Sequence, residues 1–405
     1  MDSLITAAAQ ALAAGDLLGT LKRVGLRNDP PALALRGIAM AQLGELERAK
    51  QLLRKAAAAF GPKEAVSRAR CVVAEAEIAL VQRDLAWPAK RLEAARAALE
   101  AHGDRLNTAH ARHLQIRLWL LLGRFDEAER GIATLDRVPL PPALRAAHEL
   151  VVAGIGIRRL TIKTAREALT RAARAARISG IAALMAEVES ASATLQSPAA
   201  RLIASGGERA LLLDEVETLL ASEALVVDAC RRVVRRGKTI VSLATRPVLF
   251  ALARCLGEAW PGDVPRDVLL ARAVGAKHVD ESHRARLRVE IGRLRAALKP
   301  LADIQATKDG FALTPRRSNE VAVLAPPVDE DHAAVLAFLA DGEAWSSSAL
   351  ALALGASPRT VQRALDTLAA SGKVQSLGRG RAQRWLTPPP GFPTTLLLPG
   401  PLPGD

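Results

Sequence analysis

An arginine-rich segment at residues 280–299 has the composition and spacing to bind a polyanion. Four aliphatic residues follow the i, i+4, i+7, i+11 spacing of one buried helix face: Leu287, Ile291, Leu294 and Leu298. The opposite face would carry Ala285, Arg286, Val289, Glu290 and Arg293, and a bordering row would hold Arg284, Arg288, Arg295 and Lys299. Guanidinium groups bind phosphates and guanine edges, and a carboxylate accepts a hydrogen bond from cytosine. The segment therefore has the chemistry to contact duplex DNA.

The same pattern also fits a charged helix face that is simply solvated, and the distribution of charge bears on this alternative. The chain has 405 residues and a formal net charge of +14. Residues 228–317 hold 19 Lys/Arg and 9 Asp/Glu, whereas residues 318–405 hold 6 and 8. Most of the positive excess therefore lies around the arginine-rich helix, which favours a nucleic-acid partner.

The elements expected around this helix would have to position it. Three short β-branched runs predict a small antiparallel sheet: 224–228, 232–235 and 239–243. Two helices are expected next, at 246–256 and 266–274. After the arginine helix, residues 304–313 predict a β-hairpin that turns at Asp309-Gly310. The helix is thus expected to be the third of a compact set, followed by a hairpin.

This order of elements resembles the effector domain of OmpR/PhoB-type response regulators, which is a winged-helix DNA-binding domain. The segments that carry the resemblance are 243–252, 264–275 and 291–298, within a matching region of about 222–315. Two positions depart from the family pattern: Gly292 stands where a polar or basic residue is common, and Phe311 replaces the usual tyrosine. The helical N-terminal half has no alternating βα pattern, so the resemblance does not extend to a receiver domain.

The resemblance implies that the arginine helix enters the major groove while the hairpin contacts the minor groove or the backbone. Arg286, Glu290 and Arg293 are then the candidate base-reading residues. A second set is expected to contact phosphates or to pack at the helix edge: Arg284, Arg288 and Arg295. Lys308 is the candidate contact from the hairpin.

The first two hundred residues predict one helix after another. The clearest unit, at 33–56, has small residues at Gly37 and Ala49, a helix end at Gly44, and Leu53 filling the gap between two helices. It resembles a tetratricopeptide repeat, and weaker copies follow with turns at positions 44, 84, 123 and 160. Because these turns are more widely spaced than in that family, we expect elongated helix pairs. The alternative is a plain helical bundle.

A second reading domain is expected near the C-terminus. Helices are predicted up to Leu339, at 349–354 and at 358–368, and a hairpin at 374–386 follows them. The set looks like the winged helix-turn-helix shared by many bacterial repressors. Its candidate DNA contacts are Arg359, Thr360, Gln362 and Arg363 on the third helix, with Arg379 and Arg381 on the hairpin. Small domains of this type also bind proteins, which is the alternative.

The expected fold is therefore mainly α, a tetratricopeptide-like array followed by two winged helix-turn-helix domains. The expected boundaries are 1–205 for the array, 206–315 and 316–390 for the two winged domains, and 391–405 for a Pro-rich tail. Within the tail, residues 394–398 are a strand candidate that could pair with 321–324. The segment at Ser205-Gly206-Gly207 is interpreted as a linker.

Enzymatic chemistry has no support in the sequence. No phosphate-binding glycine loop, dinucleotide fingerprint or HExxH motif is present, so no catalytic residue, cofactor or metal is expected. His278 and His283 flank Asp280, but two loop histidines are more typical of solvent or phosphate contacts than of a metal site. Scarce aromatic residues, 3% of the chain, argue against stacking on single-stranded RNA.

Together these observations predict a bacterial, cytoplasmic transcription regulator without catalytic activity. Its partner would be double-stranded DNA. Its helical array would act as a sensor or as a docking module, with RNA polymerase or a protein or peptide ligand as the candidate partner. Three scattered cysteines suit a reducing cytosol, and neither a signal peptide nor a membrane-spanning segment is expected. The alternative is a non-catalytic adaptor whose helical array binds a partner and whose winged domains mediate protein–protein contacts.

Overall fold

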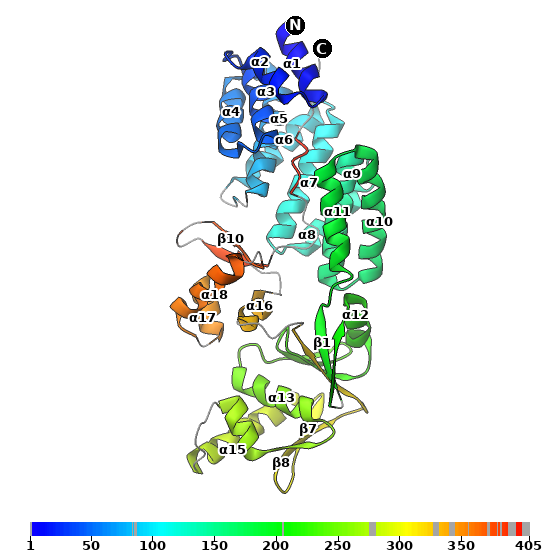
Figure 1. Ribbon diagram of the computed structural model, residues 1–405, viewed down its shortest axis with the longest axis vertical. Helices are drawn as coiled ribbons and strands as arrows, with labels where there is room; N and C mark the ends of the chain where they lie inside the picture. Colours follow the sequence, from blue (N-terminus) through cyan, green and yellow to red (C-terminus); the bar gives the residue numbers. More distant parts are fainter. Residues whose placement is uncertain are drawn as a thin grey trace.

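The computed structural model describes residues 2–82, 84, 87–204, 206–274, 281–326, 332–339, 345–354, 356–370, 373–378, 380, 383–387 and 394–398. This part of the chain is mainly helical and has a smaller sheet component, as expected. Figure 1 shows an elongated molecule, with the N-terminal helices at one end and the helices α13 and α15 at the other.

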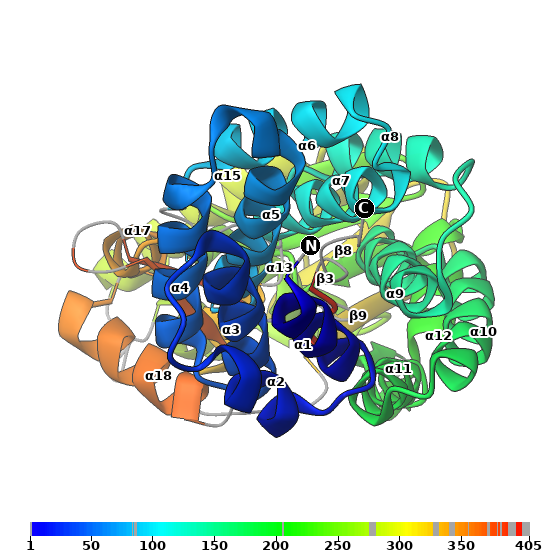
Figure 2. The same cartoon turned by 90° about the horizontal axis from the view of Figure 1, so that it is seen from above.

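The N-terminal half is a helical array in which successive helices pack on one another. Its helices are α1 (Ser3–Ala13), α2 (Leu17–Val24), α3 (Pro30–Gln42), α4 (Leu46–Ala59), α5 (Ala65–Val81), α6 (Ala89–Ala101), α7 (Arg105–Leu121), α8 (Phe125–Leu135), α9 (Pro142–Arg159), α10 (Ile162–Ser179) and α11 (Ala182–Thr194). The single turn Pro62–Glu64 precedes α5. Figure 2 shows the array from above, with α3 and α4 on one side and α9, α10 and α11 on the other.

The predicted helix turns fall between the helices of the array. Positions 44, 84, 123 and 160 lie between α3 and α4, α5 and α6, α7 and α8, and α9 and α10. Gly44 has a φ of 86°, which suits glycine at a helix end. A Cβ added to Gly37 would lie 2.9 Å from Leu53 Cγ, so the predicted contact between this small residue and Leu53 is confirmed.

A six-stranded sheet follows the array, in the order β2-β1-β9-β3-β4-β5. Its strands are β1 (Ala200–Ala204), β2 (Gly207–Leu211), β3 (Leu225–Asp228), β4 (Val233–Arg236), β5 (Thr239–Ser242) and β9 (Val321–Ala325). The predicted antiparallel set at 224–243 is confirmed as β3-β4-β5. Strand β9 pairs parallel with β3 and antiparallel with β1, and helix α12 (Leu213–Ala221) lies between β2 and β3 in the chain.

This sheet takes strands from all three of the expected domains. Strand β1 precedes the expected boundary at residue 205, and β9 follows the one at residue 315. The interpretation of Ser205-Gly206-Gly207 as a linker is wrong, because Ala204 pairs with Gly207 and Gly206, with a φ of 77°, lies in a hairpin turn. We call the sheet and the elements from α12 to β8 the central unit.

The other helices of the central unit lie between β5 and β9 in the chain. They are α13 (Pro247–Ala259), α14 (Arg266–Leu269), the π-helical segment Leu270–Val274, and α15 (Glu281–Leu298). The predicted hairpin is confirmed as β7 (Ala302–Ala306) and β8 (Gly310–Pro315), with β6 (Asp263–Pro265) on the other edge of β8. A Cβ on Gly257 would lie 3.0 Å from Val323 and 3.1 Å from Val227, so α13 packs closely on the sheet.

A smaller C-terminal unit follows, between the array and the helices of the central unit (Figure 1). It comprises α16 (Ala333–Leu339), α17 (Ser347–Leu354) and α18 (Pro358–Ala370), then a hairpin of β10 (Gln375–Leu377) and β11 (Arg384–Leu386). The predicted core residues of α18 are confirmed, since Val361, Leu365 and Leu368 are all buried. A bridge between Trp345 and Trp385 ties the hairpin to the start of α17.

The predicted pairing of residues 394–398 with 321–324 is wrong. Both edges of β9 are already occupied, by β1 and β3. Residues 394–398 lie instead against the helical array, where Leu398 is buried in a core cluster formed by α1 to α5. The tail thus returns to the first domain of the chain.

Candidate nucleic-acid interface

Helix α15 has the two faces that its sequence predicts. The aliphatic row is buried in the core of the central unit: Leu287, Ile291, Leu294 and Leu298. The cationic candidates on the rest of its surface are exposed: Arg284, Arg286, Arg288, Arg293 and Arg295. The helix packs on α13, β7 and the π-helical segment, which lie on its buried side. Its charged surface is therefore accessible in the free protein.

Between its two arginine rows, α15 presents small residues. Ala285, Val289 and Gly292 are exposed, and Val289 keeps 53% of its surface accessible. A Cβ added to Gly292 would meet no atom within 4 Å. A narrow surface of this kind lets the helix backbone approach a partner closely, while the arginines reach forward on both sides.

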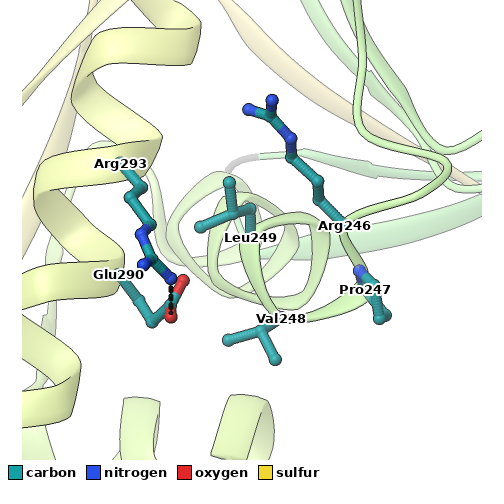
Figure 3. Close-up of a pocket in the computed structure, with 6 residues that line it drawn as sticks. All are labelled: Arg246, Pro247, Val248, Leu249, Glu290 and Arg293. Carbon is teal, nitrogen blue, oxygen red and sulfur yellow. Dashed lines mark hydrogen bonds and ion pairs between the residues drawn. The ribbon is translucent and has the colours of Figure 1, made fainter. Parts of the chain in front are cut away.

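One flank of α15 faces the start of α13 across a pocket of about 460 Å³ (Figure 3). Arg293 Nη1 donates to Glu290 Oε1 at 2.8 Å, and this ion pair lines the pocket. Arg246, which immediately precedes α13, lines the opposite side with Pro247 and Val248. Two of the three predicted base-reading residues, Glu290 and Arg293, are thus held together before any ligand arrives.

The β7–β8 hairpin is fixed to the helices through arginine. Arg295 Nε donates to the Ile304 carbonyl at 2.7 Å, and its guanidinium lies 5.9 Å from the Phe311 ring centre. Arg266 lies 5.4 Å from the same ring and donates to the carbonyls of Lys308, at 2.9 Å, and Thr307, at 3.1 Å. Phe311 is therefore the point where hairpin and helices meet, and Lys308 is exposed at the hairpin tip.

In the C-terminal unit, α18 begins as predicted. Thr360 N donates to Ser357 Oγ at 3.1 Å, which is the hydrogen bond of a helix N-cap. Arg359, Thr360 and Arg363 are exposed, while Gln362 is half-buried and donates to Asp366 Oδ1 at 2.9 Å. Arg379 and Arg381, the predicted hairpin contacts, lie outside the described residues.

One cationic contact joins the central and C-terminal units. The guanidinium of Arg232, in the turn between β3 and β4, lies 4.5 Å from the centre of the Phe338 ring on α16. Burial lowers the pKa of Arg232, as expected for a cation partly removed from water. An aromatic face stabilises such a cation without a counter-ion, so this contact holds the two units together.

Sequence reasoning missed Arg246 and Arg266. Arg246 precedes the helix-opening Pro247, a position that carries no periodic signal, and only the packing of α13 against α15 brings it near Glu290. Arg266 begins the helix predicted at 266–274, in which no site residue was proposed, and its side chain reaches the hairpin. An arginine directly before or after a helix-opening proline was the available signal, since helix starts often border a ligand.

No protein-family model, curated protein or solved structure matches the chain. Within the described ranges, no group of three or more His, Cys, Asp and Glu side chains is arranged to hold a metal ion. None of the described helices is both long and apolar enough to cross a bilayer. The function of the chain is therefore inferred from its own residues.

Proposed function

We propose that this protein binds double-stranded DNA through α15 and the neighbouring hairpin, and that it regulates transcription. The observation that carries the proposal is the division of α15 into a buried aliphatic row and an exposed surface with arginines on both sides of small residues. Such a helix fits a major groove, with base edges ahead and phosphates on either flank. The order of α13, α14, α15 and β7–β8 supports the proposal, because it is the order expected from the resemblance to a winged-helix domain.

In this proposal Arg286, Glu290 and Arg293 contact base edges, and Arg246 joins them from the start of α13. Arg284 and Arg288 bind phosphates on the other flank of the helix. Arg295 has a mixed role, because its Nε already holds β7 through the Ile304 carbonyl. Lys308, at the exposed hairpin tip, contacts the backbone or the minor groove.

The C-terminal unit is proposed as a second reader through Arg359, Thr360, Gln362 and Arg363. Two linked readers raise each other's effective concentration, so each needs only weak affinity of its own. The helical array, a tetratricopeptide-like module in this proposal, then serves as the docking surface for a protein partner such as RNA polymerase.

The test is selection of bound sequences from random duplex DNA with the full-length protein, followed by salt titration on the best sequence. A recurring motif is expected, together with an affinity that falls steeply with salt, with a slope of about −0.9 for each phosphate contact. Recovery of no motif and an affinity equal to that of unrelated DNA would contradict the proposal.

If an isolated central unit is tested for DNA binding beside the full-length protein, the fragment should span residues 199–326. The shorter fragment 222–315 would leave β3 without its parallel partner β9, although Leu225, Val226 and Val227 are all buried in the whole protein. An exposed apolar strand edge promotes aggregation. Failure of that shorter fragment to bind DNA would therefore say nothing about α15.

The competing function is that of a protein-binding adaptor. The observation that favours it is the tail, because residues 394–398 bind to the helical array through Glu77 and Glu187. The exposed α15 favours DNA, since its packing contacts lie with the central unit on its buried side. A protein that captures a peptide through the array and shows no preference among DNA sequences would support the adaptor.

A further inference from the structure

The tail segment 394–398 lies among the helices of the array, nearly two hundred residues after the array ends (Figures 1 and 2). Two glutamates hold it. Glu77 of α5 accepts hydrogen bonds from Leu397 N at 2.9 Å and Leu398 N at 2.7 Å. Glu187 of α11 accepts from Thr394 N at 2.8 Å and Thr395 N at 2.7 Å, and also from the Thr394 hydroxyl. Each carboxylate therefore binds a pair of main-chain amides.

The leucine side chains of the tail extend the cores of the array. Leu398 is buried in the cluster of α1 to α5, and Leu396 packs against the same cluster. Leu397 packs against two further clusters, one of α5 to α9 and one of α9 to α11. Three consecutive leucines thus connect all three core clusters of the array. Burial of these leucine side chains stabilises the contact between the tail and the array.

The hydrogen-bond donors to Glu77 differ from those to Glu75, a neighbouring buried glutamate. Glu75, also on α5 and buried, is satisfied within the array, by Arg54 Nε at 2.6 Å, Trp87 Nε1 at 2.9 Å and Arg91 Nη2 at 3.1 Å. Glu77 is fully buried, yet two of its hydrogen bonds come from the tail. A buried carboxylate needs hydrogen-bond donors. For Glu77, two of these donors are main-chain amides of the tail rather than groups of the array.

The remaining neighbours of Glu77 keep it charged. His110 Nε2 lies 3.2 Å from Glu77 Oε2, and Arg117 Nη1 lies 3.7 Å from Glu77 Oε1. Burial by itself raises the pKa of Glu77, but His110, Arg117 and the Leu397 amide outweigh it and hold the pKa below its usual value. An anionic acceptor forms stronger hydrogen bonds with amides than a neutral one.

The tail-binding site of the array, which we call the groove, is formed by Glu77, Glu187 and the three core clusters that the leucines contact. We propose that it is a receptor for an extended, uncharged, leucine-rich peptide, and that residues 394–398 are its resident ligand. Glu77 and Glu187 recognise the main chain, and the core clusters select the apolar side chains. A segment of the same chemistry from a partner polypeptide enters the groove when the tail leaves. A peptide with acidic residues is excluded, because its carboxylates would face Glu77 and Glu187.

A short connection to the C-terminal unit helps the tail to compete with a free peptide for the groove. Residue 387 ends the described part of the C-terminal unit and Thr394 begins the bound segment, so seven residue steps, at most about 25 Å of chain, separate them. Such a tether keeps the tail at a high effective concentration near the groove. A free peptide is therefore expected to bind poorly until the tail is removed or weakened.

The experiment measures the fluorescence anisotropy of a labelled peptide of residues 391–402 titrated with three forms of the protein. These are the wild type, a chain ending at residue 390, and the full chain with Leu398→Asp, which places a charge beside Glu77. We expect at least tenfold tighter binding to the truncated chain and to the Leu398→Asp chain than to the wild type. The point variant keeps the test valid if the truncated chain fails to fold.

Two controls isolate the recognition of main-chain amides. A peptide N-methylated at Leu397 and Leu398 has the same side chains but lacks both donors to Glu77, and should bind at least tenfold more weakly. In the truncated chain, Glu187→Gln should weaken binding, whereas Glu189→Gln should not, because Glu189 is exposed on the same helix.

Three results would overturn the proposal. One is equal binding of the peptide to the wild type and to both tail variants, and another is equal binding of the N-methylated peptide. The third is a wild-type dimer in light scattering that tail truncation dissociates, since this would place the tail in the groove of a second copy. Loss of DNA binding in the full-length protein affects none of these measurements, so this proposal and the proposed function fail separately.

Discussion

Helices α7 and α15 are both rich in cationic and titratable residues, yet they use them in opposite ways. On α7, Arg117, His110 and His113 are buried, because the helix is packed between α5, α6, α8 and α9. On α15, the arginines are exposed, because the helix packs on one side only. The packing environment, rather than the residue type, decides whether a cation organises the interior or is available to a partner.

The largest effect is expected at the buried end of this comparison. Arg117→Met removes the cation beside Glu77 and leaves that carboxylate buried with less compensation. Loss of one partner from a buried pair costs about 3–5 kcal/mol, so the melting temperature measured by calorimetry should fall by many degrees. Arg124→Met, on the exposed Arg124–Glu127 pair, is the matched control and should change stability by less than about 1 kcal/mol. Equal losses of stability in Arg117→Met and Arg124→Met would contradict the distinction between buried and exposed cations.

Arg293→Ala tests the exposed end. It should weaken binding to the selected DNA by roughly 1–3 kcal/mol and relax the preference at one base pair, with little change in melting temperature. Arg288→Ala should instead weaken binding to every sequence alike and reduce the salt slope by about one. Arg295→Ala should combine this loss with displacement of the hairpin, because its guanidinium holds β7. A large loss of stability in Arg293→Ala would show that its role is structural.

Lowering the pH should destabilise the protein first through the buried histidine His113 on α7. Burial lowers the pKa of His113 well below its usual value, and Arg117, His148 and His110 add to the shift. The unfolded chain therefore binds a proton that the folded chain does not. Stability is complete above about pH 6.5 and is lost as the pH falls from there through the lowered pKa, with a slope of at most about 1.4 kcal/mol per pH unit.

The His113 effect can be measured as melting temperature against pH between 7.5 and 5. His113→Gln should flatten the curve in this window. The lowered pKa of Glu77 contributes in a separate window, below about pH 4.5. A curve for His113→Gln that follows the wild type throughout would contradict the assignment.

Glycine substitutions give the smallest effects and a direct contrast in packing. Gly292→Ala on α15 should stabilise the protein by about 1 kcal/mol, because an added methyl group meets nothing within 4 Å. Gly131→Ala on α8 should destabilise it, because the same group would lie 2.7 Å from Ile116 on α7. Chemical denaturation of both variants measures the pair. If they shift stability in the same direction, the contrast between an open and a closed surface fails.

Local features of the fold were predictable where a residue pattern directly encodes them. Three such features are the aliphatic row of α15, the hairpin around Asp309 and the Ser357 cap. Each depends on neighbours within a few positions of the chain. The exposed candidates on α15 and α18 followed from the same periodicity. Their proposed roles in DNA binding remain predictions.

Long-range contacts were not predictable in the same way. Strand β9 was recognised as a strand, but nothing in Val321–Ala325 says that β1 and β3 are its partners. Glu77 has the local sequence of an ordinary helix residue, and only the packing of the inner helices buries it. The tail was assigned to a sheet because its apolar run suits a strand, while its actual partners are two glutamates from α5 and α11.

The position of β9 in the sheet has a consequence for synthesis of the chain. Arg201 pairs with Ala325, so the sheet stays incomplete until the arginine helix and the hairpin have left the ribosome. The array, built from contacts between sequence neighbours, can form while synthesis continues. Until β9 is synthesised, strand β1 at the end of the array has one unpaired edge. Unpaired strand edges promote association with other chains. Slow translation across residues 205–320 should therefore favour aggregation of the nascent protein.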